Sequence, residues 1–187
     1  MKPGDTGNPS LHRGISLFPL ETFCDADRHP IPDSEEIDGS EMPEPYRGLL
    51  VHDDDMTPTL ERFHEAAIHL RLLDQRNDPP LYQREVVLLL DTTDRPVEYG
   101  AIRIHLDLLS EQARILVLEA ELPMGTILAT EHIAHQNHTA SYLRLTSTPS
   151  IEAALNLPGQ TTLYGRRNII HRLAGKPIAE VLEILPP

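Results

Sequence analysis

The chain has 187 residues, with 16 Lys and Arg against 29 Asp and Glu, so its formal net charge is −13 and neither nucleic acid nor an anionic membrane surface is favoured as a partner. A single cysteine excludes an internal disulfide framework and a Cys-rich zinc site. Because no stretch approaches roughly 18 apolar residues and the N-terminus lacks the apolar core of a signal peptide, we expect a cytoplasmic protein.

The first quarter of the chain predicts a mostly irregular extension. Residues 1–45 hold seven of the 17 prolines and few large apolar residues, and the second half of this segment is acidic. Such a segment buries too little apolar surface to offset the conformational entropy lost on ordering. We expect it to touch the folded domain, residues 46–187, through Leu17, Phe18 and Phe23.

The folded domain opens with helical patterning and continues with strands. Residues 49–64 predict two short helices, with Thr57 capping a turn that begins at Pro58. Strands are predicted over residues 67–73, 82–91 and 97–106. The second of these is apolar on both faces after Glu85, which is typical of a covered central strand, and the turn sequence TTDRP that follows predicts an antiparallel hairpin.

The remainder of the chain predicts helices followed by a second hairpin. Helices are expected over residues 108–119 and, after a Pro-Gly turn, within 122–133; strands are expected over 141–146 and on both sides of the AGKP turn at 174–177. Strands, then helices, then strands predict an α+β fold with an antiparallel β-sheet rather than a βαβ crossover pattern.

Histidines and aspartates raise the question of a metal site. His132, His135 and His138 are three residues apart, the spacing that brings side chains together on a helix. Asn137 and Thr139 favour turns, however, so a structural or surface role is the favoured interpretation. The acidic triplet at 53–55 lacks a metal-binding loop and is better explained as helix-terminus charge. No phosphate-binding, dinucleotide-binding or serine-hydrolase motif is present, and we expect neither metal nor cofactor.

Two charged residues stand on otherwise apolar strand faces. Arg84 shares a face with Val86, and Glu183 shares one with Val181 and Leu185. A charge on a buried face is costly unless it is paired or used. One interpretation is a structural ion pair or an edge position that reaches water. The other is that both side chains project into one cavity, where a guanidinium suits a small carboxylate ligand.

Five short motifs occur in a characteristic order: DDDMT (53–57), YQREVVLLL (82–90), LPMG (122–125), LYGRRNIIHRLAGKPI (163–178) and EILP (183–186). Together they resemble the chorismate pyruvate-lyase family, small cofactor-free enzymes that make 4-hydroxybenzoate. The resemblance spans roughly residues 48–187. It implies an antiparallel sheet whose helices cover a buried ligand cavity, which agrees with the predicted order of elements.

The resemblance assigns ligand contacts to four residues. It places the methionine that follows the acidic residues at Met56, the pocket arginine at Arg84, and a backbone N–H contact to a carboxylate at Met124. The C-terminal glutamate matches Glu183, with Glu180 as the rival, since a shift of strand register by one residue moves a side chain to the other face.

The implied activity is the cleavage of chorismate to 4-hydroxybenzoate and pyruvate. Arg84 and the Met124 N–H would hold the ring carboxylate, and Glu183 would bind the ring hydroxyl, with Arg84 and Glu183 as the catalytic pair. The small molecule chorismate is then the expected partner, while the oligomeric state, monomer or dimer, stays open. The alternative function is a non-catalytic domain that binds or senses a benzoate-like carboxylate.

This chain departs from the family pattern beside Gly100, where the arginine that follows the glycine in some members is absent. Arg103 is one candidate to replace it. Arg166 and Arg167 either offset the negative charge near the substrate or serve the structure at a strand bend.

Overall fold

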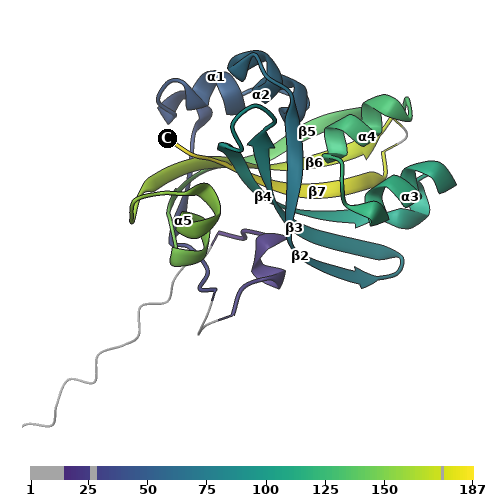
Figure 1. Cartoon of the computed structure of the whole chain (residues 1–187), viewed down its shortest axis with the longest axis horizontal. Helices are drawn as coiled ribbons and strands as arrows, with labels where there is room; N and C mark the ends of the chain where they lie inside the picture. Colours follow the sequence, from purple (N-terminus) through teal and green to yellow (C-terminus); the bar gives the residue numbers. More distant parts are fainter. Residues whose placement is uncertain (1–14, 26–28, 174) are drawn as a thin grey trace, which may run out of the picture.

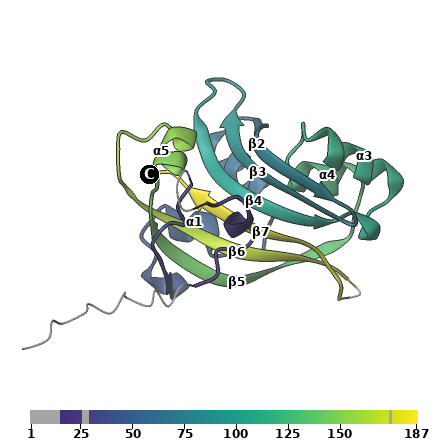
Figure 2. The same cartoon turned by 90° about the horizontal axis from the view of Figure 1, so that it is seen from below.

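The computed structural model describes residues 15–25, 29–173 and 175–187. Its strands form one antiparallel sheet in the order β1-β5-β6-β7-β4-β3-β2 (Figures 1 and 2). The strands are β1 (Ser34–Ile37), β2 (Ile68–Asp78), β3 (Leu81–Leu90), β4 (Pro96–His105), β5 (His135–Thr146), β6 (Thr162–Arg172) and β7 (Pro177–Leu185). The α-helices are α1 (Tyr46–Leu50), α2 (Met56–His64), α3 (Glu111–Glu119), α4 (Met124–Thr130) and α5 (Pro149–Leu155).

The predicted α+β class with an antiparallel sheet is confirmed, as are both hairpins, β3–β4 and β6–β7. Residue 174 of the second turn, and residues 1–14 and 26–28 of the predicted extension, lie outside the described residues. Among the residues described, no helix is long and apolar enough to cross a membrane.

Two strands run further than the sequence predicts. β2 continues to Asp78, and β5 begins at His135 rather than at residue 141. Most of the added residues of β2 are exposed, so apolar alternation does not mark them. The backbone groups of the added residues form hydrogen bonds with a neighbouring strand, β2 with β3 and β5 with β6. The side-chain pattern of one strand does not reveal such pairing.

Helix starts also differ from prediction. Thr57 does not cap α2: the helix begins at Met56, two residues before the predicted start at Pro58, with Asp55 at the N-cap, so Thr57 lies buried in the first turn. α3 begins at Glu111, because the Ser110 side chain accepts a hydrogen bond from the N–H of Ala113 (3.1 Å).

Two further helices are informative. Met124 and its neighbour Gly125 form the first turn of α4 rather than a turn before it. α5 was not predicted, although Ile151, Ala154 and Leu155 carry the three- and four-residue spacing of a buried helix face.

The N-terminal segment is more ordered than expected. Ser34–Ile37 forms β1, which pairs with β5 at the edge of the sheet. Leu17 and Phe23 are buried in the same apolar core as α5 and the outer face of β7. The apolar residues of this segment are few but concentrated, which a composition average over 45 residues conceals.

The sheet therefore has two covered faces. α5 and residues 15–25 pack on one face. On the other face, α1 and α2 cover one part of the sheet and α3 and α4 another, and α2 contacts α4 between them (Figure 1).

Candidate functional site

A cavity lies on the sheet face covered by α2 and α4. Strands β3, β4, β6 and β7 form its floor, and the first turns of the two helices close it. The cavity has a volume of about 60 Å³, several times the roughly 10–15 Å³ that one water requires. The four residues assigned by the sequence, Met56, Arg84, Met124 and Glu183, all line this one cavity.

Arg84 is the first unusual group in the cavity. Its side chain is only 1 % exposed, yet within the described chain no carboxylate pairs with it. Nη2 donates a hydrogen bond to the carbonyl oxygen of Leu122 (2.8 Å), whereas Nε and Nη1 are buried without an acceptor. Burial lowers the pKa of Arg84 to about 10, so the group is still charged at neutral pH.

Glu183 is held differently, because it has a cationic partner. Arg166, which is fully buried, donates from Nε to Oε2 of Glu183. The predicted structural ion pair therefore exists for Glu183, while the same residue also lines the cavity.

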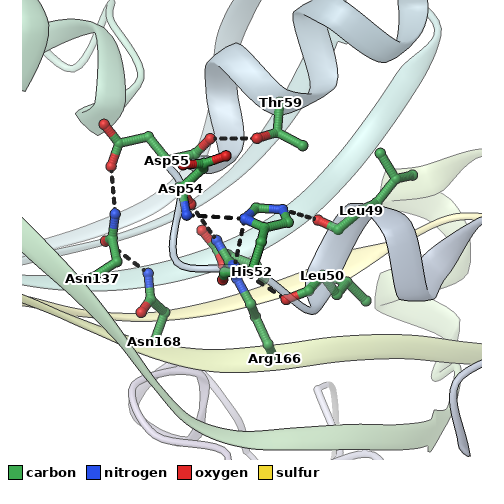
Figure 3. Close-up of polar contacts among 10 residues, drawn as sticks. Leu49, Leu50, His52, Asp54, Asp55, Thr59, Asn137, Arg166 and Asn168 are labelled. Carbon is green, nitrogen blue, oxygen red and sulfur yellow. Dashed lines mark hydrogen bonds and ion pairs between the residues drawn. The ribbon is translucent and has the colours of Figure 1, made fainter. Parts of the chain in front are cut away.

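Arg166 also anchors the loop between α1 and α2. Its Nη1 donates to the carbonyl oxygens of Leu50 (3.2 Å) and His52 (2.7 Å), and its Nη2 to that of Asp54 (3.1 Å) (Figure 3). Arg166 thus joins β6, β7 and the loop that leads into the cavity wall at Met56, which is a structural role.

Glu180 lies outside the cavity. It accepts two hydrogen bonds from Arg103, from Nε (2.6 Å) and Nη2 (2.8 Å), and the Arg103 guanidinium stacks over the ring of Phe18 at 4.1 Å. Of the two rival glutamates, Glu183 is the one that lines the cavity. Arg103 does not line the cavity either, so the structure does not place it where the missing arginine after Gly100 would stand.

Sequence reasoning missed a second cavity carboxyl, Glu98. It is 5 % exposed, lines the cavity, and its Oε2 has no partner among the described residues. Burial raises the pKa of Glu98 well above its usual range, and the charge of Glu183 raises it further, while Arg166 opposes the shift. The sequence does contain a pattern that could have identified it. Glu98 shares a strand face with Gly100 and Ile102, and a charge on such a face is the criterion that singled out Arg84.

A chain of polar side chains links the cavity wall to β5. Asp55 accepts a hydrogen bond from Nε2 of His135 (2.9 Å). Asp55 also accepts one from Nδ2 of Asn137 (2.8 Å), and Asn168 donates to Oδ1 of Asn137 (3.0 Å) (Figure 3). His135 is therefore a partner of the α2 N-cap. His138 lies further along β5.

Within the described ranges, no group of three His, Cys, Asp or Glu side chains could hold a metal ion. The histidine triplet is spread over a strand and the turn before it: His132, in a left-handed conformation, precedes β5, which contains His135 and His138.

Comparisons with known proteins found similarity to solved structures only, and each similarity covers part of the chain. No family model matches the chain, and no curated protein sequence matches it. A gene product of Staphylococcus aureus, SA0254, is 12 % identical over 64 % of this chain and 82 % of its own (TM-score 0.49). PhnF from Mycobacterium smegmatis is 14 % identical over 71 % of this chain and 63 % of its own (TM-score 0.49). A domain from Bordetella bronchiseptica, named as the ligand-binding domain of a GntR-family transcriptional regulator, is 11 % identical over 63 % and 84 % (TM-score 0.46). At TM-scores below 0.5, these similarities establish neither a family nor a function.

Proposed function

We propose that this protein binds a small organic carboxylate in the cavity, with Arg84 as the group that holds the carboxylate. The observation that carries the proposal is a buried guanidinium with two nitrogen atoms that lack an acceptor within the described part of the chain. An uncompensated buried charge is strongly unfavourable. A carboxylate ligand supplies both the missing charge and the missing hydrogen-bond acceptors.

The rest of the cavity suits a small, largely apolar ligand body. Apolar side chains such as Val86, Leu88 and Ile102 line the cavity around the polar groups. A mostly apolar wall with a few fixed polar groups is typical of sites for small molecules. The cavity volume favours a single ring over a larger ligand.

Titration calorimetry with 4-hydroxybenzoate tests this proposal. Arg84→Met should weaken binding by about 30-fold or more, because truncating one partner of a buried charged contact costs about 2–5 kcal/mol. The matched control is Arg103→Met, which removes a guanidinium outside the cavity and should leave the affinity unchanged. Unchanged affinity in Arg84→Met would contradict the proposal.

Lyase activity on chorismate is the second candidate. Its support is that four residues assigned by the resemblance, far apart in the sequence, line one cavity: Met56, Arg84, Met124 and Glu183. In this proposal Arg84 and the Met124 N–H hold the ring carboxylate, Glu183 meets the ring hydroxyl, and loss of pyruvate makes the ring aromatic.

The deciding assay is purified protein with chorismate, followed for pyruvate and for the aromatic product. Release of both in equal amounts, undiminished by a chelator, is the expected result for a cofactor-free lyase. Binding of 4-hydroxybenzoate without any turnover would instead leave the protein as a binding or sensing domain.

A further inference from the structure

The row of residues that β4 presents to the cavity is arranged around a glycine. Glu98, Gly100 and Ile102 alternate with residues of the opposite face, and Ile102 pairs with Arg84 on β3. Four residues separate Glu98 from Ile102, or about 13 Å along the strand at roughly 3.3 Å per residue. Arg84 and Glu98 therefore project from the two ends of the cavity floor.

Gly100 carries no side chain between Glu98 and Ile102, and the carboxyl of Glu98 reaches over this position. A Cβ at this position would meet the Leu182 carbonyl oxygen at 3.0 Å and Oε1 of Glu98 at 3.2 Å. Glu183 pairs with Gly100 across the β4–β7 ladder, so Glu183 borders the same space from the side.

The two carboxyl groups differ in what they are already bound to. Glu183 accepts a hydrogen bond from Arg166. Among the described residues, Glu98 has a buried oxygen without a partner, and its carboxyl lies close enough to Glu183 and Arg166 for both charges to act on it. The cavity thus contains an unpaired cationic group at one end and an unpaired carboxyl oxygen at the other.

We propose that Glu98 is a specificity-determining contact that hydrogen-bonds a hydroxyl group on the end of the ligand opposite the carboxylate held by Arg84. This inference rests on the proposed carboxylate-binding function and adds the chemistry of the ligand's other end. The matching ligand is a monocarboxylate with a distal hydroxyl, so this inference favours the carboxylate-binding function over turnover of chorismate, which carries two carboxylates.

The balance of charge in the cavity explains why a second carboxylate on the ligand is disfavoured. Arg166 and Glu183 compensate each other, which leaves the Arg84 charge for one carboxylate. Burial beside Glu183 favours the protonated form of Glu98, because the pKa of that carboxyl is raised. A protonated carboxyl donates a hydrogen bond and also accepts one, as a ligand hydroxyl requires.

The test compares three para-substituted probes by calorimetry: benzoate, 4-hydroxybenzoate and terephthalate. In the wild type, 4-hydroxybenzoate should bind about tenfold more tightly than benzoate, because benzoate leaves the buried carboxyl oxygen of Glu98 unpaired. Terephthalate should bind more weakly than benzoate, since its second carboxylate meets Glu98 and Glu183.

Two variants and one control complete the design. Glu98→Leu should abolish the preference for the hydroxyl and leave the affinity for benzoate nearly unchanged, while Glu98→Gln, whose amide still donates, should keep the preference. Glu180→Gln changes a carboxylate on the neighbouring strand outside the cavity and should behave as the wild type. Melting curves without ligand verify that each variant folds.

The outcomes separate this inference from the proposed function. If both benzoates bind equally well to the wild type, or if Glu98→Leu weakens both alike, the role of Glu98 is wrong while carboxylate binding by Arg84 stands. Tight binding of terephthalate overturns the role of Glu98 as well. If the wild type binds neither benzoate, the carboxylate-binding function fails and the role of Glu98 fails with it.

Discussion

At the scale of a single residue, Arg84 is expected to favour ligand binding while lowering the stability of the ligand-free protein. Its charge is buried, and no carboxylate among the described residues pairs with it, so replacing Arg84 by an apolar side chain of similar length should stabilise the ligand-free protein. We expect Arg84→Met to raise the melting temperature without ligand. 4-Hydroxybenzoate should then raise the melting temperature of the wild type alone. A variant less stable than the wild type would mean that the bond from Arg84 to Leu122 serves the fold.

Glu183 and Glu180 are predicted to differ in their contribution to stability. Glu183→Gln removes the charge opposite buried Arg166 and should lower the free energy of unfolding by about 3 kcal/mol. Glu180→Gln weakens the partly exposed pair with Arg103 and should cost less than about 1 kcal/mol. Urea denaturation of both variants measures the difference. Equal losses would contradict the buried ion pair as the structure shows it.

The candidate site could be predicted in part from these residue patterns. Arg84 and Glu183 stand out because each interrupts an apolar strand face, and Glu98 was open to the same reasoning. The anchoring role of Arg166 could not be found in this way. Its backbone acceptors lie at the end of α1 and in the loop that follows, more than 110 residues earlier in the chain, and only the tertiary fold brings them to Arg166.

At the scale of elements, Gly165 permits the close approach of β6 to β7. A Cβ at Gly165 would overlap the carbonyl oxygen of Glu183. We expect Gly165→Ala to destabilise the protein by about 1–3 kcal/mol, as overpacking does, and to weaken binding of 4-hydroxybenzoate by displacing the strand that carries Glu183. Gly48→Ala, at an exposed position of α1, is the matched control and should be neutral or slightly stabilising. A fully stable Gly165→Ala variant that binds normally would contradict this account.

The link between β5 and the start of α2 is predicted to depend on pH. Burial alone lowers the pKa of His135, but its hydrogen bonds to the Ile133 carbonyl and to Asp55 outweigh burial, so the pKa is raised overall. A raised pKa in the folded state means that the stabilisation is fully present below the ordinary histidine pKa of about 6.5 and is lost as the pH rises through the folded-state pKa.

His135→Gln should therefore lower the melting temperature more at about pH 5.5 than at about pH 8.5, on either side of the ordinary histidine range. Thermal unfolding of the wild type and the variant at both pH values measures this difference. His138→Gln, at an exposed position of the same strand, is the control for the substitution itself and should change the melting temperature little. The opposite trend for His135→Gln would mean that the neutral imidazole is the form bound by Asp55.

Element types were more predictable than element lengths. The two hairpins follow from alternation and turn chemistry within short stretches, and both are present. The extra length of β2 and of β5 comes from backbone pairing with a neighbouring strand, which side-chain alternation does not record.

At the scale of the whole molecule, the question is whether the domain is complete without its N-terminal segment. Leu17 is fully buried in the core behind the sheet, together with Leu182 and Ile184 of β7. These two residues flank Glu183 in the sequence and point to the opposite face, so the packing of the N-terminal segment supports the strand that carries the cavity carboxylate.

Leu17→Ala should therefore cost about 2–5 kcal/mol of folding stability, the range for a buried leucine truncated in a core. Ile31→Ala, in the same N-terminal segment but 57 % exposed, is the matched control and should change stability little. Urea denaturation of the full-length variants gives both values. If Leu17→Ala is as mild as Ile31→Ala, residues 15–25 add little to the stability of the folded domain, as the composition of the sequence indicates. If the loss is several kcal/mol, the folded unit extends to the N-terminal side of residue 46, and binding studies on this protein require the longer chain.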